Sequence, residues 1–355
     1  MPYAYPGMYI EEDSSPGLTI SSSETAVPVF AHDTLIIDSN KKMELIDSWL
    51  GFIGVLKKSS GINYKEDKLY QSMAAYFACG GGRCYVCPGT LVDDEIPKYG
   101  DVNLLVAAGE NIKTEVATLR TNGSRVFALL DSPRSLSGDL TEMDLYDSSD
   151  FSAVYGPWLR KEGVDVLVPP SAVAAGLIAR TDSTRGVWKA PANIAVAGGL
   201  SLTQHFSKED HGLYNDYAKP LNLFREFTGK GTLLWGARTL SLDIDRWRYV
   251  SVRRLFNMVE HDIETALRAM MFEPNNQPTW EKVRAAIYNY LFSLWQQGAL
   301  QGGKPEEVFN VQVGLDLTMS KTDIEAGKLI VEVGLKAVRP AEFIILKFTQ
   351  DMALP

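Results

Sequence analysis

Residues 164–180 read VDVLVPPSAVAAGLIAR, and this stretch decides the fold class. Its first five residues form a short apolar run typical of a strand, and the two prolines that follow mark the end of that run. We expect a helix over residues 171–179, because proline is well tolerated at the start of a helix. A strand that leads directly into a helix is the building unit of an α/β sheet.

The same alternation extends outward from this stretch over residues 101–197. The pattern predicts a helix at residues 112–120, a buried strand at 126–131 and a helix at 151–161. This order indicates an α/β domain with a largely parallel sheet. Further upstream we expect a strand at 27–32, a helix at 67–78 that ends at three glycines, and a strand at 84–87.

The last third of the chain has a different pattern. Apolar residues at helical spacing predict one long helix that Pro274 ends, and a second that opens at Pro278 and continues to about Gly298. Two segments with alternating apolar residues follow, and they predict a hairpin with free edges around a turn at 322–327. The apolar positions of its two strands are Phe309, Val311, Val313, Leu315 and Leu317, then Leu329, Val331, Val333 and Leu335.

Both ends of the chain resemble strands that have no partner nearby. Residues 8–12 (MYIEE) and 343–350 (FIILKFTQ) are short and β-prone, and a proline-containing stretch separates each from its neighbouring element. A terminal strand that cannot fold back usually adds to the sheet of another chain. The ends therefore predict assembly.

Composition restricts the class of protein. The 355 residues suit two domains, and a hydrophobic content of 45% with 22% charged residues is that of an ordinary globular protein. A net charge of −9 argues against a nucleic-acid or anionic-membrane partner. We find no apolar run long enough for a membrane helix and no signal peptide, and so we expect assembly in the cytoplasm without membrane insertion.

The cysteines and histidines do not predict a metal site. The three cysteines, Cys79, Cys84 and Cys87, could bind zinc only with a histidine as fourth ligand. None of the four histidines forms a suitably spaced pair near them: they are His32, His205, His211 and His261. Buried, reduced thiols are the favoured interpretation, with no metal and no cofactor.

No local motif predicts catalysis. The run Gly80-Gly81-Gly82 follows a helix and precedes a strand, the reverse of a phosphate-binding loop, and Gly229-Lys230-Gly231 fails the dinucleotide pattern. The polar cluster at 179–186 (ARTDSTRG) is favoured as an Arg–Asp bridged loop at a domain junction over a substrate site. An enzymatic function that uses carboxylates near Asp131 or Asp182 remains an alternative, because residues distant in sequence can form a catalytic site without a local motif.

A series of short motifs along nearly the whole chain is similar to those of contractile tail sheath proteins. The resemblance is strongest to the sheaths of extracellular contractile injection systems of the antifeeding prophage and Photorhabdus virulence cassette type, followed by R-type pyocin and phage tail sheaths. The motifs are YPGMYIEE (5–12), FACGGGRCYV (77–86), PPS (169–171), AG (175–176), ARTD (179–182), RGVWKAPAN (185–193), LWGART (234–239), VRRL (252–255), FEPN (272–275), GAL (298–300) and RPAEF (339–343).

The resemblance implies a mixed α/β (α+β) fold of two domains and two arms. An inner domain of helices packed on a small sheet would come from residues 26–95 plus 240–340. An outer α/β domain, called subtilisin-like in this family for its topology, would be inserted at 96–239. Residues 1–25 and 341–355 would be extended terminal arms. We find no set of Ser, His and Asp residues that would support proteolysis, so the name subtilisin-like implies no catalysis here.

The resemblance also implies a structural function. Sheath subunits stack as hexameric rings around an inner tube and contract to drive that tube through a target envelope, with the arms adding strands to neighbouring hairpins. The implied arm residues are Met8, Tyr9, Ile10, Glu11, Phe343, Ile344, Ile345, Leu346, Lys347 and Phe348, with hinges at Gly7 and Pro340. The implied acceptor residues are Phe309, Val311, Val313, Leu315, Leu329, Val331 and Val333.

The implied partners are further copies of the chain, the inner tube protein, baseplate and terminal cap proteins, and paralogous sheath subunits. We expect the tube to contact the polar side of the helix that opens at Pro278, at Glu281, Lys282, Arg284 and Asn289. The assembled particle would be released outside the cell or form a virion tail. The alternatives are a non-contractile structural or adaptor protein and an α/β hydrolase-like enzyme.

Overall fold

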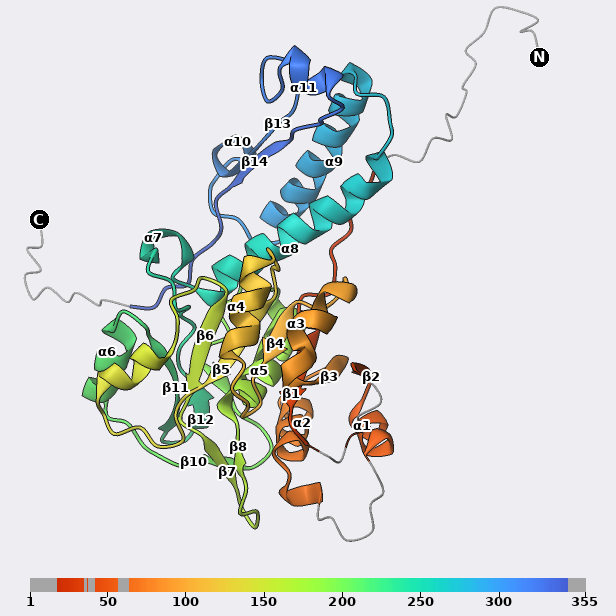
Figure 1. Ribbon diagram of the computed structural model, residues 1–355. Coiled ribbons are helices and arrows are strands. Elements are labelled where there is room, and N and C mark those ends of the chain that lie inside the picture. The colour runs from red at the N-terminus through yellow and green to blue at the C-terminus, as the bar shows by residue number, and fades with distance from the viewer. Residues whose placement is uncertain (1–17, 35–36, 38–41, 57–63, 344–355) are drawn as a thin grey trace, which may run out of the picture. The chain divides into compact units, whose positions relative to one another are not determined.

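The computed structural model describes residues 18–34, 37, 42–56 and 64–343, and these form two compact units (Figure 1). The larger unit comprises Ser23–Glu260 and Ala337–Pro355. The smaller unit comprises Met1–Ser22 and His261–Lys336. We describe each unit by itself.

The larger unit is built on a nine-stranded sheet with the order β2-β3-β1-β4-β5-β6-β11-β12-β9. Neighbouring strands from β3 to β11 are parallel, whereas β2, β12 and β9 each run antiparallel to a neighbour. The bounds are β1 Pro28–His32, β2 Glu44–Ile46, β3 Cys84–Pro88, β4 Leu104–Val106, β5 Phe127–Asp131, β6 Ser152–Gly156, β9 Ile194–Ala195, β11 Leu221–Phe227 and β12 Gly231–Leu234.

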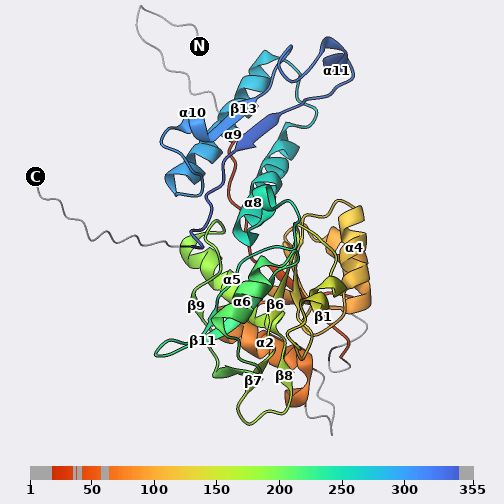
Figure 2. The same ribbon diagram turned by 90° about the vertical axis from the view of Figure 1, so that its left-hand side faces the viewer.

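Helices cover both faces of this sheet (Figure 2). Alternate strand residues point to opposite faces, so Phe30 and Val106 pack against α2 and α5, whereas Val29 and Leu105 pack against α3 and α4. The helices of the larger unit are α1 Trp49–Val55, α2 Lys68–Ala78, α3 Val92–Glu95, α4 Lys113–Thr121, α5 Pro170–Arg185, α6 Lys208–Asp216 and α7 Ile244–Trp247.

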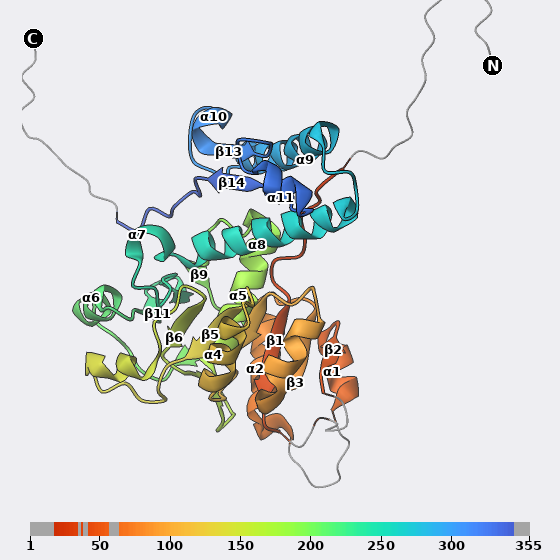
Figure 3. The same cartoon turned by 45° about the horizontal axis from the view of Figure 1, so that its top comes forward.

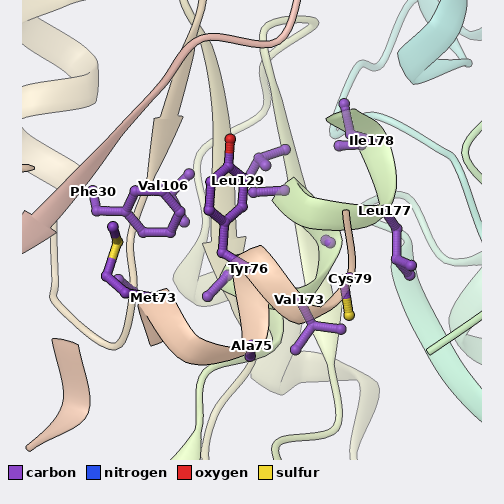
Figure 4. Packing of buried hydrophobic residues seen from close by; sticks show 14 of the residues in the cluster. Phe30, Met73, Ala75, Tyr76, Cys79, Val106, Leu129, Val173, Leu177 and Ile178 are labelled. Carbon is purple, nitrogen blue, oxygen red and sulfur yellow. The ribbon is translucent and has the colours of Figure 1, made fainter. Parts of the chain in front are cut away.

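The contact between α2 and α5 is the centre of the core (Figure 4). Tyr76 of α2 is fully buried, and its ring meets the edge of Phe30 at a centroid distance of 4.9 Å. A Cβ on Gly176 of α5 would lie 2.5 Å from the backbone oxygen of Tyr76. Only glycine therefore allows the two helices to approach this closely.

The smaller unit packs two helices with a two-stranded sheet, and its boundary with the larger unit falls within α8 (Val250–Leu267). Helix α9 (Gln277–Gln296) begins after Asn276, whose side chain accepts a hydrogen bond from the Thr279 backbone N–H. Strands β13 (Phe309–Gln312) and β14 (Glu332–Leu335) form the sheet, and the short helices are α10 (Pro305–Val308) and α11 (Lys321–Glu325). Among the residues described, we find no helix of the length and apolarity that crossing a membrane would require.

Two expectations around the opening stretch are wrong. Residues 151–161, expected to be helical, form β6 and β7 (Leu159–Lys161), because Pro157 interrupts any helix and burial between β5 and β11 favours a strand. Residues 164–168 do not join the parallel sheet. Only β8 (Leu167–Val168) is a strand, and it belongs to a separate antiparallel sheet with β7 and β10 (Leu200–Leu202). The helix expected at 171–179 is present and continues to Arg185.

The compact units differ from the expected domain boundaries. Strand β1 pairs with β3 on one side and with β4 on the other, so residues 26–95 share one sheet with residues 96–239. Residues 240–260 also belong to the larger unit. The mixed α/β class is confirmed, whereas an outer domain inserted at 96–239 does not match this division.

Candidate assembly interface

The hairpin, by which we mean β13 and β14, is the candidate site for assembly. The two strands pair antiparallel, with Phe309 opposite Leu335 and Val311 opposite Val333. In the part of the chain that the structure describes, they form a sheet of two strands only. Both outer edges therefore present backbone groups that another strand can bind.

The register indicates which backbone groups face outward. The Lys336 N–H donates to the Val308 oxygen at 2.8 Å, which makes this pair one of the hydrogen-bonded type. Such pairs alternate along an antiparallel ladder, so Asn310 with Gly334 is of the same type. The backbone groups of Phe309, Val311, Val333 and Leu335 must then point away from the partner strand. The Phe309 N–H is already bonded to the Pro305 carbonyl at the end of α10, so Phe309 offers only its carbonyl to the free edge.

One face of the hairpin rests on α9 (Figure 3). Phe309 and Val313 are buried on this face, whereas Asn310 and Gln312 are exposed on the other. Val313 packs with Trp280 of α9, whose indole N–H donates to the Asn275 side chain at 2.7 Å. The helix thus holds one face of the hairpin and leaves its edges open.

The strands of the hairpin are shorter than expected. The Gly314 carbonyl accepts bonds from Leu317, Thr318 and Met319 N–H groups at 3.1–3.3 Å, which turns the chain soon after Gln312. Consequently Val313, Leu315, Leu317, Leu329 and Val331 lie outside the two strands. The turn expected at 322–327 is replaced by α11 and its flanking residues. The expected extension of the first strand to residue 317 is therefore wrong.

The expected arms lie mostly outside the described residues. This holds for Met8, Tyr9, Ile10, Glu11 and the hinge Gly7, and for Ile344, Ile345, Leu346, Lys347 and Phe348. Phe343 is 68% exposed, and Pro340 is half-buried.

The four expected tube-contact residues lie on the exposed side of α9. Arg284 pairs with Glu281, so these two charges partly neutralise each other. Asn289 lines a cavity of about 340 Å³ together with residues 18–20 and 22. On the buried side, the Tyr290 hydroxyl donates to Asp262 at 2.6 Å, and burial together with this carboxylate raises the pKa of Tyr290.

The cluster at 179–186 is the C-terminal part of helix α5, not a loop. Its expected Arg–Asp bridge is present, but the arginine comes from α8: Arg254 Nη1 and Nη2 donate to the two oxygens of Asp182 at 3.0 and 2.6 Å. The side chains are only 4% and 5% exposed. Sequence reasoning missed this partner because Arg254 is 72 residues away.

A second arginine–carboxylate pair was not expected from the sequence. Arg238, which follows β12, makes a bidentate contact with Glu342 near the C-terminus, 104 residues further along the chain. Both residues occur in the motifs LWGART and RPAEF, but neither motif indicates the other.

The geometry gives little support to an enzymatic function that uses Asp131 or Asp182. Asp131 is partly buried, and desolvation raises its pKa to about 6, but its two oxygens accept the N–H groups of Gly109 and Ser171 at 2.8 and 2.7 Å. It therefore fixes the connections after β4 and before α5. Neither the 340 Å³ cavity nor a second of about 370 Å³ is lined by Asp131 or Asp182.

The three cysteines are free and buried, as expected. Burial raises the pKa of each thiol, in the case of Cys87 to about 12. No group of His, Cys, Asp and Glu among the described residues has the geometry of a metal site. The glycines at 80–82 form the turn between α2 and β3.

Family models match most of the chain. Residues 96–240 match the phage tail sheath protein central domain, and residues 244–351 match the phage tail sheath C-terminal domain. The chain is 50% identical to a subunit of the contracted PVC sheath complex of an extracellular contractile injection system, with a TM-score of 0.90 and coverage of 99% of both chains. It is 45% identical to a chain of the contracted anti-feeding prophage baseplate, with a TM-score of 0.88 and coverage of 98% and 99%.

A curated relative is the putative prophage major tail sheath protein of Pseudomonas aeruginosa strain UCBPP-PA14. It is 27% identical over 261 residues, which cover 71% of this chain and 66% of the relative. The chain spans 26% to 66% of the length of the curated relatives that it matches. The matched domains and the near-complete structural likeness establish that the chain belongs to the phage tail sheath family.

Proposed function

We propose that this chain is the sheath subunit of a contractile injection system, stacks as hexameric rings around an inner tube, and contracts to drive that tube forward. The observation that carries the proposal is the hairpin, which has one face fixed on α9 and two free edges. The contracted state of the similar PVC and anti-feeding prophage assemblies supports the contraction step.

The two edges suit the addition of terminal strands from neighbouring subunits. On the β14 edge, Val333 and Leu335 each offer one donor and one acceptor. On the β13 edge, Val311 offers both groups, whereas Phe309 offers only its carbonyl. An added strand could then make about four hydrogen bonds, each of which contributes roughly 0.5–1.5 kcal/mol. One added strand would stabilise a contact only modestly, but the same contact repeated around and along a tube would stabilise a continuous lattice.

Contraction would be a rearrangement of subunits between two lattice states, joined throughout by these strands. The extended state would be fixed at assembly and would lie higher in free energy than the contracted state. Neither nucleotide nor metal would be consumed in this step.

The other proposed partners are the inner tube, the baseplate and terminal cap proteins, and paralogous sheath subunits. The tube contact is assigned to the exposed side of α9 that carries Glu281, Lys282, Arg284 and Asn289. Reversal of one charge, Arg284→Glu, should reduce loading of the tube while sheath assembly continues. Unchanged tube loading in that variant would remove α9 from the tube contact.

The proposal is tested by electron microscopy of the purified protein in negative stain. We expect long striated tubes from the full chain. A variant that lacks residues 1–13 should give folded monomers with unchanged thermal unfolding but no tubes. Discrete small particles from the full chain, or normal tubes from the truncated chain, would contradict sheath formation by arm exchange.

A further inference from the structure

Glu342 is held from three sides by residues of the larger unit. Its Oε1 accepts a hydrogen bond from Arg238 Nε at 2.9 Å, and its Oε2 accepts one from Arg238 Nη2 at 2.7 Å. The Tyr249 hydroxyl donates to the same carboxylate at 3.2 Å, and the Asn215 amide donates at 3.3 Å. The Arg238 and Glu342 side chains are 8% and 23% exposed, so water has little access to this bidentate pair.

Arg238 is itself fixed to the centre of the nine-stranded sheet. Its backbone N–H donates to the Asn222 side-chain oxygen at 2.7 Å, and its carbonyl accepts from the Asn222 amide at 2.8 Å. That amide also donates to the Val154 oxygen in β6 at 3.0 Å. Arg238 Nη1 donates to the Asn215 carbonyl at 2.6 Å. Arg238 and Asn222 thus connect Glu342 to the strands β11 and β6.

The electrostatics keep this contact in place at neutral pH. Burial alone would raise the pKa of Glu342, but the hydrogen bonds and charge of Arg238 outweigh it and hold the pKa below its usual value. The ionised form that Arg238 binds is therefore present well below pH 7.

The N-terminal side of the larger unit is fixed in a similar way. The Thr25 hydroxyl donates to Asp182 at 2.6 Å, and Arg254 donates to the Thr25 carbonyl at 2.6 Å. A buried arginine–carboxylate pair therefore holds the chain just before β1, as another holds it near the C-terminus.

We propose that the Glu342–Arg238 pair is the fixed root of the C-terminal arm: it fastens the arm to its own subunit and passes tension from a neighbouring subunit into the nine-stranded sheet. The source of the tension rests on the proposed function, whereas the fastening does not. Arg339 also bonds to the larger unit, at the Asp245 carbonyl. Pro340 then lies between two fixed points and does not act as a hinge.

Spin labelling of the monomer tests the fastening directly. The native cysteines are buried, so a nitroxide can be attached selectively to Ala341→Cys, an exposed position between the two fixed points. We expect an immobilised spectrum that becomes mobile when Glu342→Ala or Arg238→Lys is added, since lysine cannot make the bidentate contact. Glu162→Ala, which removes an exposed carboxylate elsewhere, should leave the spectrum unchanged.

A label that is equally mobile with and without Glu342 would overturn the proposal. Circular dichroism establishes that each variant is folded, and Glu342→Ala alters no residue of the sheet. The label experiment needs no tubes, so it remains informative if the full chain does not assemble and the proposed function fails.

The transmission of tension is tested on assembled tubes. We expect Glu342→Ala tubes to dissolve at a lower urea concentration than wild-type tubes, while the Glu162→Ala tubes match the wild type. Equal resistance of the Glu342→Ala and wild-type tubes would overturn the role of the pair in transmitting tension.

Discussion

The two sheets of this molecule differ in their edge strands. The nine-stranded sheet ends at β2 and β9, which are only three and two residues long, and helices cover its faces. The hairpin has strands of four residues and two edges without a described neighbour. Short edge strands are a common way to prevent unwanted strand addition. Under the proposed function, the larger unit provides stability, whereas the hairpin provides the surface for assembly.

The first prediction concerns a variant that destabilises the larger unit alone, and its expected effect is the largest. Asp182→Asn leaves Arg254 buried without its anionic partner, and the free energy of unfolding of this unit should fall by about 3–5 kcal/mol. Denaturant unfolding measures the loss. Glu264→Gln, in the exposed pair with Arg268 of the smaller unit, should cost less than about 1 kcal/mol. Equal losses in the free energy of unfolding for Asp182→Asn and Glu264→Gln would contradict the proposal that the larger unit provides the stability.

The second prediction concerns the free edges of the hairpin. Val311→Pro and Val333→Pro each remove an outward N–H and leave the bonds between β13 and β14 in place. We expect the protein concentration needed for tube formation to rise at least about tenfold, or roughly 1.4 kcal/mol per subunit. Sedimentation of tubes measures this, with Gln312→Ala as the control on the exposed face.

The outcome for each proline variant also separates the two edges. If only one edge accepts a strand, only one variant will impair assembly. Normal assembly by both variants would contradict strand addition to the hairpin.

The third prediction concerns substitutions that alter the exposed face of the hairpin and leave the backbone groups at its edges unchanged. A Cβ on Gly334 would lie 2.2 Å from the Asn310 side-chain oxygen, so Gly334→Ala should destabilise the smaller unit by about 1 kcal/mol. Adding Asn310→Ala should restore stability, as thermal unfolding can show. The concentration needed for assembly should stay the same in both variants, and a large change would mean that this face also forms contacts.

The fourth prediction concerns the pH dependence of the stability of the larger unit. The pKa of Asp131 is raised from 3.8 to about 6 by burial, so the folded protein retains this proton where the unfolded chain has lost it. The free energy of unfolding should therefore fall as pH rises from about 4 through about 6. Asp131→Asn should lack this component of the pH dependence, and parallel profiles for the two proteins would contradict the assignment.

Local patterns were sufficient to predict several elements of both units. The helix at 67–78 and the opening of α9 at Pro278 follow from caps and apolar spacing, and alternation predicted the core of β13. Residues 151–161 were misassigned because a short apolar run suits either a helix or a buried strand. Only pairing with β5 and β11 makes this run a strand.

The fixed points of the arms could not be predicted from the sequence. The residues of the Arg238–Glu342 pair are 104 positions apart, and those of the Arg254–Asp182 pair are 72 apart. Arginines and acidic residues are common along the chain, and only the fold selects which of them meet. The acceptor role of the hairpin and the contacts of the arms remain predictions.

Amide hydrogen exchange at single-residue resolution, on monomers and on assembled tubes, tests the central claim most directly. We predict that the outward amides of Val311, Val333 and Leu335 exchange rapidly in the monomer and become strongly protected in the tube, because an added strand then accepts their hydrogen bonds. The Phe309 amide is bonded to the Pro305 carbonyl within the monomer, so it is not part of this test. The amides of Asn310 and Gly334, which face the partner strand, should be protected in both states. Tubes in which these three outward amides still exchange as fast as in the monomer would contradict assembly through the edges of the hairpin.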